Sequence, residues 1–70
     1  MDEKPVLLAS MEAEIAVIGG VMEVPETLVE VAAIVRSGDF STDLHRRIFD
    51  TMLAMDAAGQ PIDLLTLGAW

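Results

Sequence analysis

Hydrophobic positions recur at helical spacing along most of the chain, and no stretch alternates between hydrophobic and polar positions long enough to predict a strand. Ser10 is a suitable N-cap for a first helix over residues 11–23. Glu12 and Glu14 fall in its first turn, where the helix dipole favours acidic side chains. Its predicted hydrophobic series consists of Ile15, Ile18 and Met22.

Gly19 and Gly20 lie within this first predicted helix. Each glycine disfavours a helix by about 1 kcal/mol relative to alanine. Two interpretations stay open: the small residues let another helix approach closely, or the helix bends there.

A second helix is predicted to begin at Pro25, because the missing N–H of proline costs nothing at the first helical position. Its hydrophobic stripe consists of Leu28, Val31, Ala32 and Val35. Ser37 and Gly38 should end it, since Gly38 suits the left-handed position that follows many helices.

The third helix, over about 42–58, has the clearest pattern. Its candidate caps are Asp39, Ser41 and Thr42, and its hydrophobic face consists of Ile48, Phe49, Met52 and Met55. Residues 57–59 should end it, and Pro61 prevents continuation. Asp63 can then cap a fourth helix that begins within residues 64–70.

The domain organisation follows from these elements. Residues 1–9, with Pro5 and a charged start, are predicted to form a flexible N-terminal lead-in. Residues 10–70 are predicted to form one small all-α domain. Because the chain stops at Trp70, about two turns into the fourth helix, the sequence is expected to be cut within that element.

Composition narrows the functional classes. A chain of 70 residues buries only about 60% of its unfolded surface and is marginally stable alone. Twelve acidic residues against four basic ones give a net charge of −8, which opposes direct binding to nucleic acid. No cysteine is present, no hydrophobic run approaches the ~20 residues that span a bilayer, and no secretory signal is recognisable, so a cytoplasmic protein is expected.

The single histidine is the most conspicuous candidate for chemistry. His45 falls at the edge of the hydrophobic face of the third helix, without a cysteine or a second histidine to share a metal ion. We therefore interpret it as a structural histidine. Arg46 and Arg47 are expected to form helical ion pairs, Arg47 with Asp43 and Arg46 with Asp50.

Nucleotide-binding and catalytic motifs are missing from the sequence. Neither the P-loop pattern nor G-x-G-x-x-G occurs, and no nucleophile, base and acid stand in a suggestive arrangement. No catalytic, cofactor-binding or metal-binding residue is predicted.

Three segments together resemble the N-terminal domain of the DnaB-type replicative DNA helicase. They are "SMEAEIAVIGGVM" (10–22), "GDFSTDLHRRIF" (38–49) and "GQPIDLLTL" (59–67). The matching positions are Glu12, Ala13, Glu14, Val17, Gly19 and Gly20; Asp39, Phe40, His45, Arg46, Ile48 and Phe49; and Pro61, Ile62, Asp63, Leu64, Thr66 and Leu67. Ser41 departs from the family, which usually has tyrosine there.

The resemblance implies a small orthogonal helical bundle, here truncated within its fourth helix, that forms part of a collar on a hexameric ring. It implies ring assembly with other helicase subunits, contact with primase and, in some systems, with a helicase loader. The full-length protein it resembles is an ATP-dependent 5′–3′ DNA helicase, whose ATP and Mg²⁺ serve a motor domain outside this segment. The alternative is a free-standing, phage-derived regulatory protein that mimics the collar.

The resemblance also implies structural roles for the second segment. Asp39 is expected in a turn or cap, and Phe40, Ile48 and Phe49 in the core. His45 is expected to be a hydrogen-bonding residue of the fold.

Overall fold

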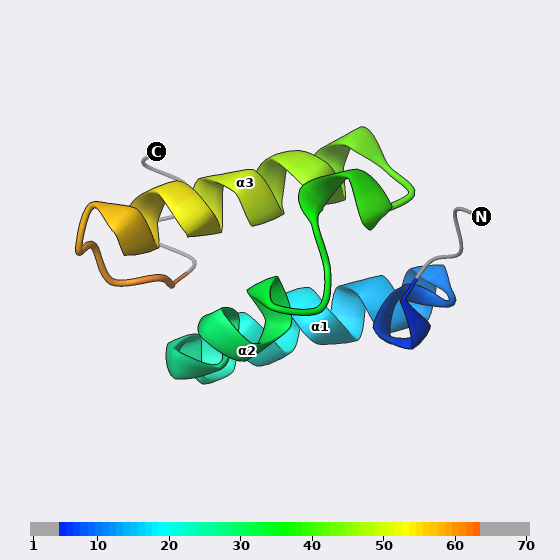
Figure 1. Cartoon of the computed structure of the whole chain (residues 1–70), viewed down its shortest axis with the longest axis horizontal. Helices are drawn as coiled ribbons and strands as arrows, with labels where there is room; N and C mark the ends of the chain where they lie inside the picture. Colours follow the sequence, from blue (N-terminus) through cyan, green and yellow to red (C-terminus); the bar gives the residue numbers. More distant parts are fainter. Residues whose placement is uncertain (1–4, 64–70) are drawn as a thin grey trace.

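The computed structural model describes residues 5–63, which are helical and contain no strand. The elements are the 3-10 helix η1 (Val6–Leu8), α1 (Met11–Glu23), the 3-10 helix η2 (Pro25–Thr27), α2 (Leu28–Ala32), the 3-10 helix η3 (Ser37–Asp39) and α3 (Asp43–Ala57). Figure 1 shows α3 in one layer and α1 with α2 in the other, joined by the segment that follows α2. The predicted all-α class is confirmed.

One hydrophobic core fills the space between the two layers. Its buried members are Leu8, Ile18, Val21, Leu28, Val35, Phe40, Phe49, Met52, Met55 and Ile62. The rings of Phe40 and Phe49 lie 5.1 Å apart between centroids at its centre. Because the core draws on positions from 8 to 62, neither end of the described range can be removed without exposing it.

α1 has the predicted bounds and the predicted cap. The Ser10 hydroxyl accepts the backbone N–H of Ala13 at 3.1 Å and so satisfies one of the free donors of the first turn. The predicted inward series is wrong at Ile15, which is 56% exposed. The buried positions are Glu14, Ile18 and Val21, a set at i, i+4 and i+7 whose first member is polar.

α2 is much shorter than the predicted second helix. Pro25 does start the helical turn, but the turn is η2, and α2 ends at Ala32 instead of near Gly38. Ala32 is exposed, whereas Leu28 and Val35 are buried as predicted. The segment is rich in β-branched residues, which restrict side-chain rotamers in a helix; they are Val29, Val31, Ile34 and Val35.

The ending predicted for the second helix is also wrong. The Asp39 carboxylate accepts the backbone N–H of Arg36 at 2.9 Å and supports the separate turn η3. Gly38 lies inside that turn, and Gly59 is the one glycine with positive φ among residues 5–63. The side chain of Asp39 therefore stabilises a new turn where the sequence predicted only a helix end.

α3 confirms the prediction almost to the residue. Thr42, one of the three candidate caps, accepts the N–H of His45 at 3.1 Å. Gly59 follows the helix with φ 72°, and Gln60 N–H donates to the carbonyl of Met55 at 2.9 Å, which closes the last turn. The predicted fourth helix falls on residues 64–70, outside the described residues.

The core begins earlier in the chain than predicted. Val6–Leu8 form η1, and Leu8 is fully buried, so the core includes a residue of the predicted N-terminal lead-in. Residues 1–4 lie outside the described range.

Candidate functional site

A buried carboxylate lies where α1 meets the start of α3. Glu14 is 1% exposed, and it is the one buried charged residue in the described part of the chain. A carboxylate is retained in an apolar interior only when hydrogen-bond donors replace the water it has lost. Glu14 and the residues that contact it therefore form the candidate functional site.

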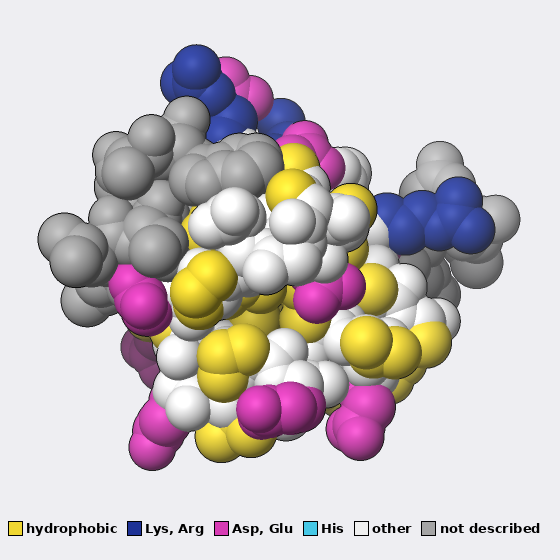
Figure 2. Space-filling model, turned by 90° about the vertical axis from the view of Figure 1, so that its left-hand side faces the viewer, with side chains coloured by type: hydrophobic (Ala, Val, Ile, Leu, Met, Phe, Trp, Pro, Cys, Tyr) yellow, Lys and Arg dark blue, Asp and Glu magenta, His cyan; other side chains and the backbone are white. Residues whose placement is uncertain are grey.

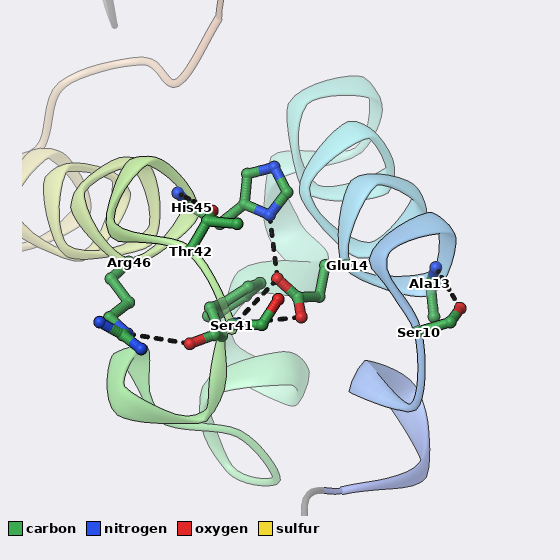
Figure 3. Close-up of polar contacts among 8 residues, drawn as sticks. Ser10, Ala13, Glu14, Ser41, Thr42, His45 and Arg46 are labelled. Carbon is green, nitrogen blue, oxygen red and sulfur yellow. Dashed lines mark hydrogen bonds and ion pairs between the residues drawn. The ribbon is translucent and has the colours of Figure 1, made fainter.

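Among residues 5–63, two donors reach the Glu14 carboxylate from the other layer. The backbone N–H of Ser41 lies 3.1 Å from each of its oxygens, and Nδ1 of His45 lies 2.9 Å from Oε1 (Figure 3). An ionised carboxylate can only accept hydrogen bonds, so Nδ1 of His45 is assigned as the donor in this contact. We call these three residues the Glu14–Ser41–His45 cluster.

The local sequence around His45 places its side chain in this cluster. Thr42 caps α3 through the His45 N–H, which fixes the first turn of the helix and with it the direction of the imidazole. The ring of Phe40 meets the imidazole edge to face, with centroids 6.3 Å apart. The side chain of His45 is 12% exposed.

Arg46 forms further contacts at the start of α3, next to the cluster. Its Nε donates to the carbonyl of Phe40 at 2.9 Å (Figure 3). Its Nη1 lies 3.4 Å from Oδ1 of Asp43. The sequence predicted different pairs, Arg46 with Asp50 and Arg47 with Asp43, and neither is formed among residues 5–63. The pairing differs because Arg46 turns back toward the Phe40 carbonyl at the helix start, which brings it beside Asp43.

The geometry supports cohesion of the fold better than catalysis. Both oxygens of Glu14 accept hydrogen bonds, and Glu14 is 1% exposed, whereas a general base must reach the proton that it removes. Ser41 contacts Glu14 through its backbone amide. The cluster ties α1 to the segment before α3 and to α3 itself.

The other residues that carried the family resemblance divide between core and surface. Phe40, Phe49 and Ile62 are buried, and Ile48 packs partly buried against the core. Ala13 and Asp39 are partly buried in the capping turns of α1 and η3. The exposed members are Glu12, Gly19, Gly20, Pro61 and Asp63. The structure therefore gathers the hydrophobic and hydrogen-bonding members but leaves the two glycines of α1 at the surface.

The sequence does not identify Glu14 as the centre of the cluster. Its position predicts only the charged start of a helix, and a contact made by the backbone amide of Ser41 cannot be predicted from residue types. One signal was available: Glu14 stands at the helical spacing of Ile18 and Val21, which places it on the inward face.

Residues 5–63 offer no group of three or more His, Cys, Asp or Glu residues arranged to hold a metal ion. In the same range, every helix is too short or too polar to cross a membrane.

Comparison with known proteins identifies the family of the chain. The model of the DnaB-like helicase N-terminal domain matches residues 6–70. The chain belongs to this family. A replicative DNA helicase DnaB of Geobacillus stearothermophilus is 42% identical over 60 residues, which is 86% of this chain and 13% of that helicase. One from a Nostoc species is 34% identical over 61 residues, which is 87% of this chain and 7% of that helicase.

The chain thus spans about a tenth of the length of these curated relatives. No solved structure matches it. Within this DnaB-like domain, the first two segments that carry the resemblance meet at the cluster, Glu14 from the first and Phe40 with His45 from the second. Ile62, from the third, is buried in the hydrophobic core.

Proposed function

We propose that this chain is the N-terminal collar and assembly segment of a replicative DNA helicase. In that role it supports assembly of a hexameric ring in the cytoplasm and contacts primase and a helicase loader. It binds no cofactor and hydrolyses no ATP itself. ATP and Mg²⁺ act in the motor of the full-length helicase, which unwinds DNA in the 5′–3′ direction.

This proposal rests on the contact between Glu14 and His45. These two residues, the most reactive ones among the positions that match the family, bind each other and hold α1 against α3. A module that acts by presenting surfaces needs a fixed shape, and a buried charge-assisted hydrogen bond gives that shape a defined register. A catalytic module would instead keep such groups accessible.

The surface supports a role in protein contacts. Exposed large hydrophobic residues are found on several elements: Val6, Leu7, Met11, Ile15, Val24, Val29, Ile34 and Leu44. Figure 2 shows hydrophobic side chains across one end of the molecule with acidic side chains around them. Apolar exposure on this scale favours contact with other proteins, and the net charge of −8 disfavours contact with DNA.

A chimera tests the proposal. Residues 6–70 would replace the matching segment of the Geobacillus stearothermophilus helicase, and ring assembly would be measured by native mass spectrometry, with primase binding measured separately. We expect hexamers that bind primase. A His45→Ala chimera should hydrolyse ATP at the parental rate per folded hexamer. A folded chimera that forms no ring and binds no primase would refute the proposal.

A further inference from the structure

We draw no further inference here: the strongest candidate, the exposed apolar face of α1 around Gly19 and Gly20, carries nothing because the chain spans only about a tenth of the length of its curated relatives and nothing in the structure shows what covers this face.

Discussion

Nδ1 of His45 in α3 lies 2.9 Å from Oε1 of Glu14 in α1, although 31 positions separate the two residues in the chain. This hydrogen bond joins α1 to α3 at the buried carboxylate. It lies beside the ring of Phe40, which in turn contacts the ring of Phe49. Sliding α3 along α1 by one residue would separate the imidazole from the carboxylate. The pair therefore contributes to the register of the layers, together with the packed core.

Removing the Glu14 side chain should destabilise the domain strongly. Glu14→Ala leaves the Ser41 N–H and the imidazole of His45 without their acceptor, which we expect to lower the free energy of unfolding by about 2–4 kcal/mol. Urea unfolding followed by circular dichroism measures the change. Glu12→Ala, on the exposed side of the same helix turn, is the control and should shift stability by only about 0.5 kcal/mol. Equal effects of the two substitutions would contradict the assignment.

Glu14 and His45 should also be energetically coupled. His45→Ala and Glu14→Ala each break the same hydrogen bond, so the double variant should be less destabilised than the sum of the single variants, by about 1–3 kcal/mol. A double-mutant cycle measures this coupling. Thr51→Ala, combined with Glu14→Ala, serves as the reference pair, because the Thr51 hydroxyl bonds within α3 to the carbonyl of Arg47. Additivity in the Glu14–His45 cycle would show that the contact contributes nothing to stability.

Phe49 should be an anchor of the core. It is 1% exposed and contacts Phe40, so Phe49→Ala should cost about 3–5 kcal/mol. In so small a domain this loss is comparable to the whole free energy of unfolding, and the helical signal should disappear at room temperature. Leu44→Ala, at a 65% exposed position of the same helix, should melt close to the parent. Unchanged melting of Phe49→Ala would place this side chain outside the core.

The glycines should respond to alanine in opposite directions. Gly19→Ala and Gly20→Ala meet no neighbour within 4 Å and should each stabilise α1 by about 0.5–1 kcal/mol. Gly59→Ala also finds open space, but its φ of 72° strains any residue with a Cβ atom, so this change should cost about 1–2 kcal/mol. Thermal melts of the three variants decide the matter, and a stabilising Gly59→Ala would contradict the left-handed conformation.

Elements defined by local signals could be predicted from the sequence. The Ser10 and Thr42 caps and the glycine after α3 marked the ends of α1 and α3, because each acts through hydrogen bonds or dihedral angles within a few residues. The predicted length of the second helix was wrong for the opposite reason. Its length depends on how Val35 reaches the core and on the hydrogen bond from Arg36 to Asp39, both of which are tertiary or turn-specific.

The candidate site was only half predictable. The edge position of His45 on α3 followed from its spacing to Phe49, and its hydrogen-bonding role was implied by the family resemblance. Its partner could not be found in the same way, because Glu14 lies in another helix and looks like a favourable first-turn acid. The partners of Arg46 were mispredicted because a backbone carbonyl, that of Phe40, competes with the side chains at helical spacing.

The distance in sequence between Glu14 and His45 has a consequence for synthesis on the ribosome. At about 5–20 residues per second, Glu14 is added roughly 2–6 seconds before His45. Until α3 has also left the ribosomal exit tunnel, residues 15–22 of an emerged α1 have no α3 to pack against, and their apolar surface is open to chaperones. Nascent chains arrested when α1 but not α3 has left the tunnel should therefore cross-link to a chaperone through α1, and chains arrested after α3 has left it should do so less.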